Sequence, residues 1–161
     1  MDGSFDYTSN KASCGGLARN DQDQGEWMKG FTYGIGTCLE GMVEAWVLLK
    51  GIQMAKLLGV RQVCFESDSK TIVNAITNDF VCDSLTDNVL FACKKELADI
   101  QAWHLAFIPR ELNTAVDHLA KFAGGRKGTT ILHQPSESIL QCLEDDKSGL
   151  PIWRQLETES L

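Results

Sequence analysis

The sequence lacks the features that mark membrane-spanning and secreted chains. It contains no run approaching the roughly 18 apolar residues that a membrane span needs, and no charged, apolar and small-residue signal opens it. Internal repeats and low-complexity stretches are also missing. With 161 residues and an apolar fraction of 43%, the chain can form one domain with its own core.

None of the six cysteines stands in a CxxC pair. They lie at positions 14, 38, 64, 82, 93 and 142, and several fall in apolar, periodic segments. This spacing disfavours both a disulfide framework and a zinc site. We therefore expect buried thiols in an intracellular, reducing compartment, which can be the nucleus or the cytoplasm.

Basic charge is scarce as well. Fifteen Lys and Arg residues stand against 22 Asp and Glu residues, which gives a net charge of −7. Domains that hold nucleic acid by bulk electrostatics are usually basic, so the balance counts against that mode of binding. Arg110, Lys121, Arg126 and Lys127 form either a modest basic patch or ordinary surface charges.

Hydrophobic periodicity predicts an α/β order. Residues 13–20 and 26–36 are typical of an antiparallel hairpin, and the opening segment completes a three-stranded meander. Helices are predicted over 39–58, 67–77, 83–99 and 113–123, and strands over 60–67 and 102–108. After Gly124 the pattern weakens to a loop or extended segment, followed by a short helix over 136–145. There Ile139, Leu140, Leu143 and Trp153 can pack back on the sheet or meet a partner.

Acidic residues interrupt these patterns. Glu44 shares a helix stripe with the apolar Val47, Leu48 and Ala55, so it is either a partly solvated edge residue or a ligand beneath the helix. Burying it unpaired would cost several kcal/mol or raise its pKa.

Asp68 ends a predicted strand, where α/β proteins bind ligands and where helix caps also lie. Because Ser69 can supply the cap, Asp68 is free for another role. Asp117 points away from the apolar stripe of its helix, as a solvated first-turn charge does. Asp2 by itself is only a polar residue near the start of the chain.

Five segments, in this order, resemble the plant reverse-transcriptase-like ribonuclease H domain, a relative of type 1 and retroelement ribonucleases H. They are DGSF at 2–5, GGLAR at 15–19, EAWVLLKGIQMA at 44–55, ESDSKTIVNAI at 66–76 and IPRELNTAVDHLAKFA at 108–123. The resemblance implies a ribonuclease H-like α/β fold, with three antiparallel and two parallel strands in one five-stranded mixed sheet flanked by helices. We expect this domain to span residues 1–124 and a C-terminal tail to span 125–161.

The family's acidic quartet falls on Asp2, Glu44, Asp68 and Asp117, as catalytic residues and metal ligands. It implies two Mg²⁺ ions, with Mn²⁺ as a substitute, because oxygen-only ligands suit these cations and because converging carboxylates repel one another unless neutralised. The implied reaction is two-metal-ion hydrolysis of the RNA strand of RNA–DNA hybrids.

The implied enzyme acts as a monomer and reads 2′-hydroxyls and backbone shape rather than sequence. Ser4, Asn10, Gly15 and Gly16 are the expected substrate contacts. Asn113 is expected either to touch the substrate or to position Asp117.

Two departures from the family pattern support an alternative function. Phe107 stands where the family has a histidine that assists proton transfer, and His104 lies on the opposite face of the strand. Met1 replaces several apolar residues of the first strand, so we expect a short strand from a trimmed gene product, an incomplete gene model or a retroelement fragment. The alternative is a weak or inactive ribonuclease H-like domain that binds nucleic acid or protein.

Overall fold

The computed structural model describes residues 1–19, 27–79, 81–122 and 128–147. The predicted meander is confirmed by β1 (Asp2–Asp6), β2 (Lys11–Arg19) and β3 (Trp27–Thr37), which pair antiparallel. β6 (Gly128–Leu132) then pairs antiparallel with β3, in the segment for which sequence left loop and extended chain open. The pairing with β3 is what makes this segment a strand.

The parallel pair lies in a second sheet. β4 (Gln62–Ser67) runs parallel to β5 (Ala102–Phe107), and together they form a two-stranded sheet beside the four-stranded one. Where the sheets meet, the Met1 amino nitrogen donates to the Glu66 carbonyl oxygen at 3.3 Å. The mixed α/β architecture is therefore confirmed, but the predicted five-stranded sheet is divided into four strands and two.

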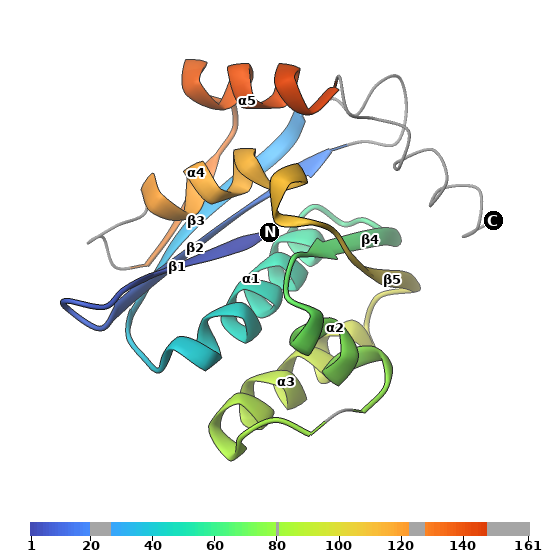
Figure 1. Cartoon of the computed structure of the whole chain (residues 1–161). Coiled ribbons are helices and arrows are strands. Elements are labelled where there is room, and N and C mark those ends of the chain that lie inside the picture. Colours follow the sequence, from blue (N-terminus) through green and yellow to red (C-terminus); the bar gives the residue numbers. More distant parts are fainter. Residues whose placement is uncertain (20–26, 80, 123–127, 148–161) are drawn as a thin grey trace.

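Helices cover both faces of the four-stranded sheet (Figure 1). On one face lies α1 (Val43–Leu57), which follows the short 3₁₀ helix η1 (Glu40–Met42) and ends just before Gly59, whose φ is +67°. A left-handed residue at this point is a common helix terminator, and glycine adopts it without steric penalty. On the other face lie α4 (Thr114–Phe122), which follows the 3₁₀ helix η2 (Arg110–Leu112), and α5 (Glu137–Lys147).

Two further helices pack on the outer side of α1. The Ser69 hydroxyl caps the N-terminus of α2 (Lys70–Thr77) by accepting a hydrogen bond from the Ile72 amide. The Asp83 carboxylate caps α3 (Ser84–Leu97) by accepting from the Leu85 and Thr86 amides. These side chains satisfy backbone donors that have no partner inside the helix.

The largest buried cluster lies between α1 and these two helices, where Leu48 and Ile52 meet Val89 and Leu97. None of the helices in the described ranges is long and apolar enough to cross a membrane.

Part of the expected tail packs on the domain. Ile139 of α5 is buried against Ala115 and Leu119 of α4, whereas Leu140 is exposed. The Leu143 side chain and Trp153 lie outside the described residues. The β6–α5 segment thus packs beside α4, in a cluster that also includes Leu17 of β2 and Leu132 of β6.

Candidate active site

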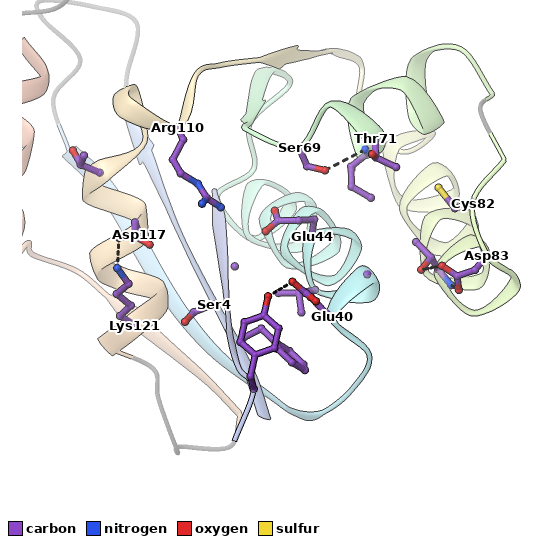
Figure 2. A pocket seen from close by; sticks show the side chains of 18 residues that line it. Ser4, Glu40, Glu44, Ser69, Thr71, Cys82, Asp83, Arg110, Asp117 and Lys121 are labelled. Carbon is purple, nitrogen blue, oxygen red and sulfur yellow. Dashed lines mark hydrogen bonds and ion pairs between the residues drawn. The ribbon is translucent and has the colours of Figure 1, made fainter. Parts of the chain in front are cut away.

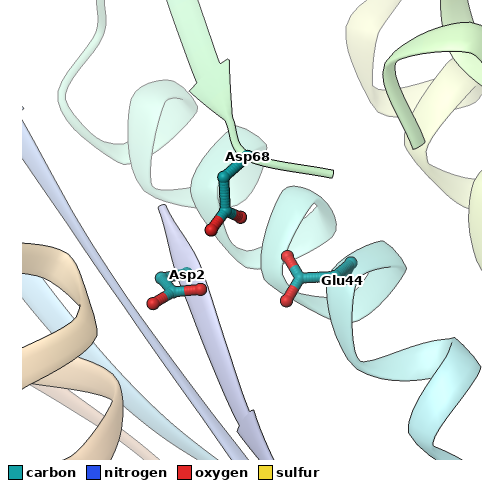
Figure 3. Close-up of side chains that lie close together, drawn as sticks. All are labelled: Asp2, Glu44 and Asp68. Atoms are coloured by element: carbon teal, nitrogen blue, oxygen red, sulfur yellow. The ribbon is translucent and has the colours of Figure 1, made fainter. Parts of the chain in front are cut away.

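Three carboxylates meet where the two sheets approach each other (Figure 3). Asp2 begins β1, Glu44 lies in the first turn of α1, and Asp68 directly follows β4. One oxygen atom of each lies within 4.8 Å of the others. Segments far apart in the chain therefore deliver three anionic ligands to one point.

Asp2 is held in place by its neighbours and is only 2% exposed. The Gly3 amide donates to its Oδ1 at 2.9 Å. From η2's C-terminal end, the buried Asn113 side chain donates from Nδ2 to the Met1 carbonyl oxygen, also at 2.9 Å. Asn113 thus fixes the backbone just before the carboxylate.

Glu44 approaches the cluster across a glycine. A Cβ atom on Gly3 would lie 2.9 Å from Glu44 Oε1 and 2.4 Å from Val43 Cγ1, so only glycine permits this approach. The other carboxylate oxygen, Oε2, is buried and has no hydrogen-bond partner among the described residues. Burying a carboxylate oxygen in this way is unfavourable unless a cation or a proton compensates it.

Asp68 has a basic partner. Arg110 of η2 donates from Nε to Asp68 Oδ2 at 3.3 Å. Because Ser69 caps α2, the Asp68 side chain is free to face the cluster, as the sequence predicted.

The electrostatics of the cluster favour a cation. Burial, and then the charges of Asp68 and Asp117, raise the pKa of Asp2 to about 7. Burial, followed by the charges of Asp2 and Asp68, raises the pKa of Glu44 to about 7. An oxygen-only donor set with mutual repulsion and an unpartnered buried oxygen fits a hard divalent cation such as Mg²⁺.

A groove of about 900 Å³ opens in front of the cluster (Figure 2). Asp117 and Lys121 of α4 line one side of it, and Ser4 and Glu44 line its middle. Its far side is lined by α2 and α3 residues that include Thr71 and Asp83. Of the acidic quartet, Glu44 and Asp117 are among the residues that line it.

Asp117 stands apart from the cluster of three. It lies on the groove wall, where Lys121 Nζ donates to its Oδ2 at 2.7 Å. As the sequence predicted, it points away from the buried stripe of Ala115, Val116 and Leu119. Its charge nevertheless acts on Asp2, because it helps to raise the pKa of that carboxylate.

Comparison with known proteins agrees with this arrangement. The sequence model of the reverse transcriptase-like family matches residues 1–123. The chain belongs to this family. The ribonuclease H resemblance is thereby confirmed, whereas a plant or retroelement origin stays a prediction. No sequence among the curated proteins matches the chain.

Solved ribonucleases H share the fold of this reverse transcriptase-like chain. RNase H1 from the archaeon Halobacterium salinarum NRC-1 superposes with a TM-score of 0.71 at 19% identity, covering 76% of this chain and 92% of its own. The N-terminal RNase H domain of a Mycobacterium tuberculosis protein gives 0.69 at 20% identity, with coverages of 76% and 88%. LC11-RNase H1, solved in complex with an RNA/DNA hybrid, gives 0.68 at 17% identity, with coverages of 75% and 91%.

The residues expected to contact substrate separate into two groups. Ser4 lines the groove, whereas Asn113 holds the Met1 backbone instead of reaching the groove or the Asp117 side chain. Gly15 and Gly16 are buried, against α4 and against the Phe31 ring, so they serve packing. Asn10 is exposed in the β1–β2 turn with φ of +53° and is not among the residues that line the groove.

Phe107, at the position of the family histidine, ends β5 and is 40% exposed. The Lys70 ammonium lies 5.1 Å from the centre of its ring, a cation–π distance. His104 is exposed on the same strand. No imidazole is thus supplied at position 107.

Sequence reasoning missed the pairing of two basic residues with the acidic quartet. Arg110 pairs with Asp68 and Lys121 with Asp117, and both basic side chains are largely exposed. Arg126 and Lys127 lie outside the described residues. The i,i+4 spacing of Asp117 and Lys121 was a visible signal. Nothing in the sequence pattern marked the Arg110 contact, which depends on how η2 meets the end of β4.

Proposed function

We propose that this chain is a divalent-metal-dependent ribonuclease H that hydrolyses the RNA strand of RNA–DNA hybrids. The observation that carries the proposal is the convergence of Asp2, Glu44 and Asp68, with oxygen atoms within 4.8 Å of one another, at the edge of a groove. Membership of the reverse transcriptase-like family supports it, as does a fold shared with an RNase H1 solved with an RNA/DNA hybrid.

In this proposal Asp2, Glu44 and Asp68 hold Mg²⁺ or Mn²⁺, and Asp117 completes a site for two ions from the groove wall. Bound divalent cations supply an activated water and stabilise both the phosphate charge and the leaving oxygen. The Gly3 amide and Asn113 keep Asp2 in position, which preserves the geometry on which such sites depend.

The groove residues bind the substrate. The Ser4 hydroxyl offers a donor and an acceptor beside the carboxylates, suited to a 2′-hydroxyl. Arg110, 82% exposed at its side chain, can reach a phosphate from the groove rim. An acidic domain can therefore bind a polyanion locally, through cations at the cleft rather than through its net charge.

The test is cleavage of a hybrid labelled on its RNA strand, with Mg²⁺ or Mn²⁺, beside labelled RNA and DNA duplexes. The parent is expected to cut the hybrid and Asp68→Asn to lose this activity. Asp79→Asn is the matched control, because Asp79 is a surface residue paired with Lys94, and it should retain activity. A folded parent that cuts no hybrid at any metal concentration would overturn the proposal.

One observation favours a second candidate function. Phe107 cannot carry a proton at the position of the family histidine, so a weak or inactive domain that binds nucleic acid or protein is the alternative. Retention of hybrid by the parent without cleavage, measured by fluorescence anisotropy, would support this alternative.

A further inference from the structure

Gly15 lies at the crossing point of β2 and α4. It is the direct cross-strand partner of Asp2 in the β1–β2 ladder. Antiparallel partners present their side-chain positions on the same face of the sheet. The face of Gly15 that meets α4 is therefore the face beside Asp2.

The contact between Gly15 and α4 is very close. A Cβ atom built on Gly15 would lie 2.6 Å from Leu119 Cβ, 2.7 Å from the Ala120 nitrogen and 2.8 Å from the Leu119 carbonyl carbon. These atoms belong to the helix backbone or are attached directly to it, so no side-chain rotation can relieve the overlap. The gap would have to open by roughly 1 Å to restore ordinary van der Waals contact.

Neighbouring contacts decide which element would move. β2 is hydrogen-bonded to β1 on one side and to β3 on the other, so it is held within the sheet. On the same face of β2, Ser13 Oγ donates to the Ala120 carbonyl oxygen at 2.7 Å, which holds α4 against the strand. A methyl group at position 15 would consequently lift α4 rather than bend β2.

We propose that Gly15 is a positioning residue that sets the distance of Asp117 from the Asp2–Glu44–Asp68 cluster. Asp117 lies one turn of α4 before Ala120, so a helix lifted at Ala120 carries the Asp117 carboxylate away from Asp2. The absent side chain at position 15 thus lets the fourth carboxylate act with the other three. This inference rests on the proposed function for its catalytic meaning.

Gly16 offers a matched comparison within the same strand. A Cβ on Gly16 would lie 2.3 Å from the Phe31 ring, on the opposite face of β2 from α4. Gly16→Ala is therefore expected to disturb the core beside α1 and to leave the contact between α4 and β2 unchanged. The two substitutions add the same methyl group but only one should displace Asp117.

The experiment combines Gly15→Ala with Asp117→Glu, whose extra methylene extends the carboxylate by about 1.5 Å. Gly15→Ala alone is expected to lower cleavage on the order of 100-fold and to weaken Mn²⁺ binding measured by calorimetry. Asp117→Glu alone should also lower cleavage and weaken Mn²⁺ binding, because the longer side chain places its carboxylate beyond the position that the Asp117 carboxylate occupies in the parent. Together they should recover much of the loss, whereas Asp117→Glu should not rescue Gly16→Ala.

Metal-free crystal structures of the parent and Gly15→Ala make the result independent of catalysis. The inference expects α4 to move away from β1; an α4 that stays in place, or a double variant no better than Gly15→Ala, overturns it. A parent that neither binds Mn²⁺ nor cleaves the hybrid refutes the proposed function. In that case the two crystal structures still show whether Gly15 sets the distance between α4 and β1. If Gly15→Ala does not fold, Ser13→Val tests the same contact, since a methyl group cannot lie 2.7 Å from the Ala120 oxygen, and it should show the same shift and the same rescue.

Discussion

Arg110 reaches Asp68 from solvent: its side chain is 82% exposed, yet it donates to a carboxylate whose side chain is only 6% exposed. The hydrogen bond and charge of Asp68, then the charges of Asp2 and Asp117, raise the pKa of Arg110. Arg110 is thus the protein's own counterion at this site. A divalent cation on Asp68 must share or displace it.

Arg110→Gln is therefore expected to strengthen Mn²⁺ binding. Exposed ion pairs contribute up to about 1 kcal/mol, so the gain should be a few-fold in Kd, measured by calorimetry. Affinity for the hybrid should fall at the same time, because a phosphate contact is lost. Lys94→Gln removes an equal charge at a remote surface pair and should change neither; unchanged Mn²⁺ affinity in Arg110→Gln would contradict the competition.

The metal-free protein should lose stability as pH rises. The pKa values of Asp2 and Glu44 lie at about 7 in the folded protein, above the ordinary values of 3.8 and 4.5 for these side chains. Between about pH 4 and 7 the folded state holds protons that the unfolded chain has released, so the free energy of unfolding decreases across this window.

Asp2→Asn removes one of these groups. At pH 8 without metal it should be more stable than the parent, on the order of 2 kcal/mol, and the difference should shrink toward pH 5. Urea denaturation at both pH values measures this. Asp79→Asn, at an exposed aspartate, should give no such gain; a parent as stable as Asp2→Asn at pH 8 would show that the carboxylates do not repel.

Asn113→Ala should destabilise the fold and weaken the metal site together. The Nδ2 hydrogen bond to the Met1 carbonyl is lost and that oxygen is left without this donor, which typically costs about 1–3 kcal/mol. Thermal unfolding and Mn²⁺ titration report the two effects. Asn74→Ala, on the exposed side of α2, provides the comparison and should leave Mn²⁺ affinity unchanged.

Phe107→His should raise the rate of hybrid cleavage if proton transfer limits it. A positioned general acid or base typically contributes about 100-fold to 10,000-fold, and the pH–rate profile should gain a limb near the histidine pKa. Phe107→Leu removes the ring without adding a proton carrier and is the control. Equal rates in the two variants would show that a group other than residue 107 moves the proton.

Local patterns predicted much of the fold and of the cluster. The periodicity of α1 placed Glu44 on a stripe with the buried Val47 and Leu48, and the cap at Ser69 freed Asp68. These features depend on short-range chemistry. The family resemblance was needed to add Asp2 and Asp117, since a terminal aspartate and a first-turn charge carry no distinguishing periodicity.

Contacts between distant segments could not be predicted in the same way. Glycine in a strand indicates close approach, but sequence does not say whether the approaching group is substrate or helix. At Gly15 the answer is α4, and at Gly3 it is Glu44. The pairing of β6 with β3 and the contact of Arg110 with Asp68 likewise depend on tertiary geometry.

The β6–α5 segment determines how far the protein can be truncated from its C-terminus without exposing buried apolar residues. The family match ends at residue 123, yet Ile139 of α5 is buried against Ala115 and Leu119 of α4. A protein trimmed at the similarity boundary would expose Ala115 and Leu119 and free the outer edge of β3. The family match therefore ends before the last segments that pack on the domain, β6 and α5.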